Sequence, residues 1–207
     1  MTTVAALGLL LAAEARGNRP LAWVAKPVAS AGFLALALAR GAPESGYGRL
    51  VLAALALGWL GDVLLIPKGA RRAFAAGLAA FLLGHLVFAV AFAVRGLAPA
   101  WLAGGSLATA AVALPVARWL APHVPDALRV PVRAYVVVIS AMVACAAGAY
   151  GATRDAALLV GAVAFFLSDL AVARERFVAK GLANKLWGLP LYYGGQLLLA
   201  WTAGAPG

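Results

Sequence analysis

The sequence predicts an all-α integral membrane protein, a bundle of about eight transmembrane helices. Of its 207 residues 65% are hydrophobic and 12% charged, and the mean hydropathy is +0.95, whereas a soluble domain is roughly half apolar and a quarter charged. The apolar residues fall in successive runs near the ~20 residues that cross a bilayer, and no alternating pattern indicates an outer-membrane barrel. A soluble globule and a disordered chain are therefore excluded.

The first four runs are each bounded by arginine or proline. Residues 3–15 lack the basic leader of a cleaved signal, so we expect this span to be retained. Residues 20–39 open on a proline, which suits a first helical turn. Residues 48–66 stop at Pro67, and residues 73–94 stop at an arginine.

The last four runs follow the same rules. Residues 99–120 precede a proline-containing loop, residues 131–150 begin at a proline, and residues 155–173 end before a basic segment. The eighth run, 182–202, is interrupted by Pro190. These spans leave only short connectors, so we expect one transmembrane domain over the whole chain, 1–207.

The basic residues predict the orientation. The net charge is +10, and the basic residues that produce it lie mainly in loops. They therefore indicate how the chain is oriented in the membrane and that it contacts anionic lipid, rather than nucleic acid. Four basic residues follow even-numbered spans: Arg40, Arg49, Arg95 and Arg154. Twelve follow odd-numbered spans: Arg16, Arg19, Lys68, Arg71, Arg72, Arg118, Arg129, Arg133, Arg174, Arg176, Lys180 and Lys185. We therefore expect a bacterial inner-membrane protein with both termini outside the cytoplasm.

A weak internal repeat relates the two halves of the chain. The segment that ends at Asp62 (Trp-Leu-Gly-Asp) resembles the one that ends at Asp169 (Phe-Leu-Ser-Asp), at an offset of 107 residues that also carries His85 onto Tyr192. Four spans per repeat preserve orientation, so the pattern predicts a parallel 4+4 duplication.

Polar residues inside the spans carry most of the functional information, because an ionisable group in the bilayer is costly unless it is paired or hydrated. At 1.5 Å per residue, Lys26 lies about 9 Å from the cytoplasmic end of its span, and Asp62 and Asp169 each about 6 Å. His85 lies deeper, at about 18 Å. The supporting polar residues are Ser30, Ser168, Lys185, Tyr192, Tyr193 and Gln196. Together they indicate a site in the cytoplasmic half of the bundle.

Each of these residues also has a purely structural explanation. Lys26 can snorkel to the headgroups or form a structural ion pair with Asp62. His85 can be an ordinary interhelical hydrogen-bonding residue, and Tyr192 and Tyr193 can be packing aromatics.

Several chemistries are disfavoured by what the sequence lacks. There are only two histidines, and His123 lies in a loop, so no metal site is expected. No G-x-S-x-G elbow or glycine-rich phosphate loop is present, and the lone Cys145 suits a small buried residue. We expect no cofactor, no nucleic acid and no obligate protein partner. Paired carboxylates doing acid–base work fit best.

The ordered set of motifs resembles one family. The chain departs from that family at two positions: Gly58 stands where serine is common, and Phe88 stands where tyrosine is common. The motifs are Lys26-Pro27, Gly61-Asp62, Phe81-x-x-Gly84-His85, Ser168-Asp169 and Tyr192-Tyr193-x-x-Gln196. On these residues the chain is similar to the YhhN family of multi-pass membrane proteins, which also contains the mammalian TMEM86 lysoplasmalogenases.

The resemblance implies hydrolysis of the vinyl ether of a lysoplasmalogen, a lysophospholipid substrate drawn from the membrane, to a fatty aldehyde and glycerophosphoethanolamine or glycerophosphocholine. It also implies that Asp62 and Asp169 are the catalytic pair. Vinyl ethers hydrolyse through protonation at carbon, which requires a protonated acid beside a second, ionised carboxylate. Two other classes remain open: a proton-coupled transporter and a lipid-binding membrane protein without catalysis.

Overall fold

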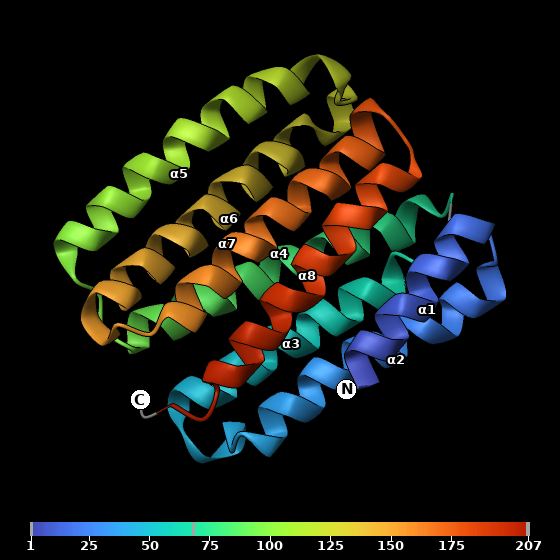
Figure 1. The fold of residues 1–207 in the computed structure, drawn as a ribbon. Helices are drawn as coiled ribbons and strands as arrows, with labels where there is room; N and C mark the ends of the chain where they lie inside the picture. The colour runs from blue at the N-terminus through green and yellow to red at the C-terminus, as the bar shows by residue number, and fades with distance from the viewer. Residues whose placement is uncertain (1, 68, 206–207) are drawn as a thin grey trace.

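Eight α-helices run back and forth along a shared direction in the computed structural model, which describes residues 2–67 and 69–205 (Figure 1). These described residues contain helices and connectors and no strand. Short 3₁₀ turns lie at Ala42–Glu44 and Ala121–His123, and a π-helical turn lies at Arg174–Val178. The helices are α1 (Thr2–Arg16), α2 (Arg19–Ala39), α3 (Gly46–Leu64), α4 (Arg71–Val94), α5 (Pro99–Leu120), α6 (Asp126–Thr153), α7 (Ala156–Ala173) and α8 (Leu182–Thr202).

Each apolar run of the sequence corresponds to one helix, and the largest difference lies at α6. That helix begins at Asp126 rather than at Pro131, which lies inside it. Pro131 is the sixth residue of α6, beyond the four N–H groups that lack intrahelical partners, so the helix continues through it without the hydrogen bond that residue 131 would otherwise donate to residue 127. The ion pair between Asp126 and Arg129, 2.9 Å apart, spans this added turn.

Six of the helices are long and apolar enough to cross a membrane: α2, α3, α4, α5, α6 and α7. The 15-residue α1 and the more polar α8 are not among them. The described residues therefore form an all-helical, multi-pass membrane protein with six candidate spans, where the sequence predicts eight.

The helices pack mainly as sequential hairpins, α1 with α2, α3 with α4, α5 with α6 and α7 with α8. Contacts of α4 with α6 and of α2 with α8 then join the hairpins into one bundle. Figure 1 shows α8 near the middle of the bundle and α5 at its edge. Only Ala113 and Leu120 of α5 are buried, so this helix is the most peripheral.

Glycine permits the closest helix contact near the centre of the molecule. A Cβ atom on Gly195 of α8 would lie 2.8 Å from the carbonyl oxygen of Gly161 on α7. The two backbones therefore touch, as small residues allow in membrane bundles. This contact fixes α8 beside α7, and the two helices carry the polar residues described next.

Candidate active site

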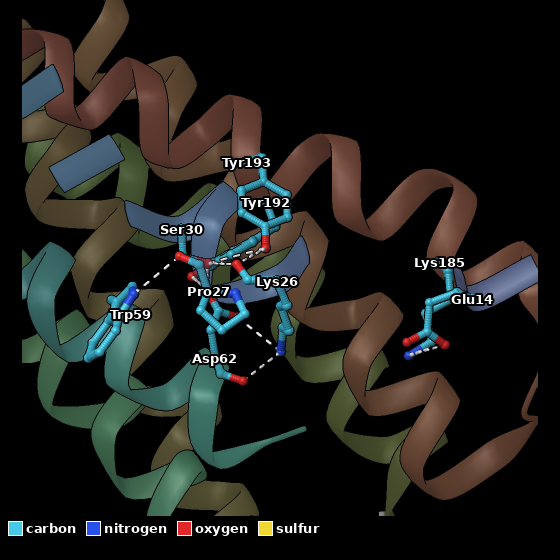
Figure 2. Close-up of polar contacts among 9 residues, drawn as sticks. All are labelled: Glu14, Lys26, Pro27, Ser30, Trp59, Asp62, Lys185, Tyr192 and Tyr193. Atoms are coloured by element: carbon cyan, nitrogen blue, oxygen red, sulfur yellow. Dashed lines mark hydrogen bonds and ion pairs between the residues drawn. The ribbon is translucent and has the colours of Figure 1, made fainter. Parts of the chain in front are cut away.

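Asp62 lies in the last turns of α3 and is buried, and three side chains from two other helices bind its carboxylate. From α2, Ser30 Oγ lies 2.6 Å from Oδ2, and Lys26 Nζ lies 3.1 Å from Oδ1. From α8, Tyr192 donates its hydroxyl to Oδ2 at 2.6 Å. Figure 2 shows these groups converging on Asp62 between α2, α3 and α8.

The partners of Asp62 suit an ionised carboxylate. A carboxylate only accepts hydrogen bonds, and here both oxygens have donors, one of them a cation. Lys26 Nζ also lies 3.1 Å from the Asp62 backbone oxygen, which holds the ammonium beside the helix end. Asp62 is therefore a fixed negative charge with its partners in place.

Tyr193 contacts this cluster through Ser30 and the backbone of α2. Its hydroxyl lies 3.2 Å from Ser30 Oγ and donates to the Lys26 carbonyl oxygen at 3.4 Å. The Ser30 hydroxyl has one proton, and its shortest contact is with Asp62. Tyr193 therefore acts on Asp62 through Ser30, whereas Tyr192 contacts the carboxylate directly.

Asp169 on α7 is held differently, by two neutral aromatic side chains. Tyr135 of α6 donates its hydroxyl to Asp169 Oδ2 at 2.7 Å, and His85 Nε2 of α4 lies 3.4 Å from the same oxygen. Among the described residues, no lysine or arginine side chain contacts this carboxyl group as Lys26 contacts Asp62. The Asp169 side chain is also more exposed, 15% against 3% for Asp62.

The orientation of His85 constrains where a proton lies. Its Nδ1 is 2.6 Å from the Phe81 carbonyl oxygen, which can only accept, so Nδ1 carries the hydrogen. In a neutral imidazole Nε2 is then an acceptor that faces Asp169 Oδ2. Two acceptors would repel each other there, so a proton shared between His85 and Asp169 would stabilise the pair, which in this structure is 3.4 Å apart and makes no hydrogen bond through Nε2 to any described residue.

The depth of His85 differs from the prediction, which put it about two helical turns deeper than Asp169. The path of α7 accounts for part of the difference: beyond Ala173 the chain continues as a π-helical turn to Val178. At 1.5 Å per residue, Asp169 lies about 14 Å from Val178 and His85 about 21 Å from Arg71, where α4 begins, so the difference in depth falls to about 7 Å.

The remaining predicted site residues have less direct roles. Ser168 donates to the Phe165 carbonyl oxygen at 2.7 Å, inside its own helix. Lys185 Nζ lies 3.9 Å from Glu14 Oε2, apart from the Asp62 cluster in Figure 2. Gln196 is fully buried, and neither its amide nitrogen nor its oxygen has a hydrogen-bond partner among the described residues.

Gly58 accounts for the unpartnered amide of Gln196. A Cβ atom built on Gly58 would lie 3.4 Å from Gln196 Nε2 and 3.5 Å from the Tyr192 hydroxyl. A serine at this position would place a hydroxyl between the two groups, whereas glycine places none. The departure from the family pattern at residue 58 therefore leaves a polar group without a partner next to the site.

One cavity of ≈ 710 Å³ joins the two aspartates. Lys26, Asp62, Asp169 and Tyr192 line it, together with Lys185. The other basic residues along its wall are Arg19, Arg176 and Lys180. A carboxylate with its cation and a second carboxyl group beside a histidine thus face one space with a basic wall.

The sequence did not single out Tyr135, which binds Asp169. The signal was available: Tyr135 is four residues inside the predicted sixth span, the same distance from its cytoplasmic end as the two aspartates are from theirs. Within residues 2–67 and 69–205, no three His, Cys, Asp or Glu side chains lie together in a way that could hold a metal ion.

Comparison with known proteins gives a family and several named relatives. The family model described as the YhhN family matches residues 21–203. Proteins named lysoplasmalogenase from Mycobacterium bovis and Mycobacterium tuberculosis are each 37% identical over 199 residues, 92% of this chain and 72% of theirs. Lysoplasmalogenase TMEM86B of Rattus norvegicus is 31% identical, covering 78% of this chain and 64% of its own. No solved structure matches the chain.

Proposed function

Because the chain belongs to the YhhN family, we propose that it is a lysoplasmalogenase, a membrane hydrolase that cleaves the vinyl ether of lysoplasmalogens. Its products are a fatty aldehyde and glycerophosphoethanolamine or glycerophosphocholine. One observation carries the proposal: one cavity is lined both by Asp62, whose carboxylate is paired with Lys26, and by Asp169, whose carboxyl group faces His85. The names of the relatives support it independently.

The two carboxyl groups suit the two halves of the reaction. Asp169 delivers the shared proton to the vinyl carbon remote from oxygen, and the adjacent carbon becomes an oxocarbenium ion. Water adds to that carbon and releases a proton, giving a hemiacetal that separates into the aldehyde and the glycerol hydroxyl. The proton returns to the pair formed by Asp169 and His85.

Asp62 supplies a fixed negative charge during these reaction steps. Its carboxylate stabilises the cationic intermediate or takes the proton of the attacking water. Lys26, Ser30 and Tyr192 hold it in place without needing to move during the reaction. Tyr193 positions Ser30, and Tyr135 orients Asp169.

The basic wall of the cavity suits the lipid phosphate. Arg176, Lys180 and Lys185 line the cavity, and Arg19 joins them from α2. Of the other basic loop residues, Arg174 is hydrogen-bonded to Asn184, and Lys68 lies outside the described residues. We place the phosphate near Arg19, Arg176, Lys180 and Lys185, whose cationic side chains can bind it.

We further propose that α1 and α8 also lie in the bilayer, giving eight spans in one domain built from two related halves. The contacts of the aspartates support the duplication. Asp62 of α3 binds side chains from α2 and α8, and Asp169 of α7 binds side chains from the corresponding helices, α6 and α4. The two carboxyl groups therefore occupy equivalent places in a 4+4 arrangement.

The charges at the end of the bundle remote from the site favour both termini outside the cytoplasm of a bacterial inner membrane. Arg40 and Arg154 lie over the rings of Trp201 and Trp101, so their charges are engaged within the protein. At the site end Arg19 and Lys180 line an open cavity, although Arg176 lies over the Phe74 ring and Lys185 beside Glu14. A reporter fused to the C-terminus that is active only in the cytoplasm would reverse this orientation and move the site to the other leaflet.

The test of function is the purified protein with a lysoplasmalogen, assayed for free aldehyde. Asp62→Asn and Asp169→Asn keep shape and remove the acid, so we expect folded proteins with ~10²–10⁴-fold lower rates. Asp126→Asn is the matched control, because Asp126 is 86% exposed and does not line the cavity. If either site variant keeps more than about a tenth of the rate, the paired mechanism is wrong. Transport or lipid binding without aldehyde release would favour the two alternative classes.

A further inference from the structure

An apolar trough runs along the outer side of the bundle between α5 and α7, with α6 as its floor. Its wide part, ≈ 630 Å³, is lined by Gly104 and Val112 of α5, Val143 of α6 and Val163 of α7. Phe166 of α7 also lines it. We call this space the α5–α7 trough.

Next to the trough lies a smaller apolar space of ≈ 90 Å³, lined by residues of α4, α5, α6 and α7, which we call the neck. Phe166 lines both spaces, and the α5 wall passes without a break from Val112 in the trough to Ala113 in the neck. Asp169 and Tyr135 also line the neck. Asp169 also lines the polar cavity, so it lies where the apolar and polar spaces meet.

The length of this path corresponds to one leaflet. From Asp169 to Leu159, the outermost α7 residue lining the trough, ten residues of helix rise about 15 Å. The hydrocarbon core of a bilayer is about 30 Å thick, so one leaflet is about half of that. A hydrocarbon chain whose polar end is at Asp169 would therefore fill the trough and end near its far limit.

We propose that the α5–α7 trough binds the single hydrocarbon chain of the substrate, with the neck admitting one chain to Asp169. This inference rests on the proposed function and adds the place and class of the ligand's apolar part. The vinyl ether joins chain to glycerol, so a chain in the neck brings that bond to Asp169 and leaves the phosphate beside the basic wall. The peripheral α5 makes the trough open to lipid from the side.

A photoreactive lipid tests the location without requiring hydrolysis. The ligand is a saturated-ether lysophosphatidylethanolamine with a diazirine at the end of its chain, bound to wild-type protein in detergent and mapped by mass spectrometry. We expect labelling on α5 near Gly104 and on α7 near Leu159 and Val163. Excess unlabelled lysolipid should remove this labelling, whereas a two-chain phospholipid should not.

Two glycine variants make a matched pair for the same test. A Cβ atom on Gly104 meets no atom within 4 Å, so Gly104→Trp fills the trough without disturbing helix packing. Gly194 of α8 is equally open but lies outside the trough, so Gly194→Trp is the control. We expect Gly104→Trp to abolish the labelling and to lower kcat/KM for an octadecenyl substrate roughly tenfold or more, while an octenyl substrate is spared.

The outcomes separate this proposal from the proposed function. Labelling spread over the lipid-facing helices, or lost equally in both glycine variants, overturns the trough even if wild-type protein releases aldehyde. Labelling confined to the trough in a protein that releases no aldehyde supports the chain site and rejects hydrolysis. Association of the protein into dimers through α5, detected by light scattering and lost in Gly104→Trp, would assign the trough to a second copy.

Discussion

Replacing Tyr192 by phenylalanine removes one oxygen atom from the site and leaves the ring. That oxygen lies 2.6 Å from Asp62 Oδ2 and is the only donor that α8 sends to this carboxylate among the described contacts. A hydrogen bond to a charged group contributes about 1.5–3 kcal/mol. At 1.36 kcal/mol per tenfold, its loss corresponds to roughly 10- to 150-fold in rate if Asp62 acts in the transition state.

The adjacent tyrosine provides the matched control. Tyr193→Phe also removes one hydroxyl from α8, but that hydroxyl binds the neutral Ser30 and a backbone carbonyl at 3.2 and 3.4 Å. Long bonds between neutral groups contribute at the low end of about 0.5–1.5 kcal/mol. We therefore expect a loss of only a few-fold, well below that of Tyr192→Phe.

The assay is aldehyde release per folded molecule, with thermal unfolding measured on the same preparations. A double variant separates catalysis from packing: if Tyr192 acts through Asp62, then adding Tyr192→Phe to Asp62→Asn should change the rate little further. Equal losses in the two tyrosine variants, or additive losses in the double variant, would refute the assignment of Tyr192 as a positioning residue for Asp62.

Three further predictions concern the neighbouring groups. Gly58→Ser should raise the free energy of unfolding by about 1 kcal/mol, because the new hydroxyl reaches the unpartnered Gln196 amide; Gly58→Ala, which gains helix propensity alone, should melt at a lower temperature than the serine variant. Tyr135→Phe should lower aldehyde release by roughly tenfold or more through loss of the 2.7 Å bond to Asp169, and a rate unchanged from wild type would contradict its role. Chelators should leave activity unchanged, because His85 is the one histidine predicted inside a span; loss of activity with rescue by zinc would replace the mechanism with a metal-activated water.

The sequence singled out both carboxylates and the partners of Asp62 but not Tyr135, for a physical reason. A charged residue in hydrocarbon is rare, so Asp62 and Asp169 stand out from the apolar runs on either side. Tyr135 does not stand out, because a tyrosine is common in membrane helices and only its neighbours show that it binds a carboxyl group. Counting depth along each helix overestimated the difference in level between His85 and Asp169, because helices end at different levels and α7 continues beyond its apolar run.

The helices were predicted more closely than the way they assemble. Apolar runs and prolines mark where a helix begins and ends, and only α6 differs by more than two residues. The trough at the edge of the bundle left no signal in the sequence, because its walls have the same small and branched apolar residues as the packed helices. The absence of a partner for Gln196 likewise depends on a glycine that lies 138 positions earlier and faces it only after folding.

The hydrogen bond between Tyr192 and Asp62 also fixes an order of events during synthesis. The two residues are 130 positions apart, which at about 5–20 residues per second separates them by roughly 6–26 seconds on the ribosome. Lys26 and Ser30 are made before Asp62, so the carboxylate enters the membrane with a cation already available. The tyrosine and one wall of the cavity arrive only with α8. A chain released before its last helix can therefore hold Asp62 as an ion pair, but it has no completed site until the final helix is inserted.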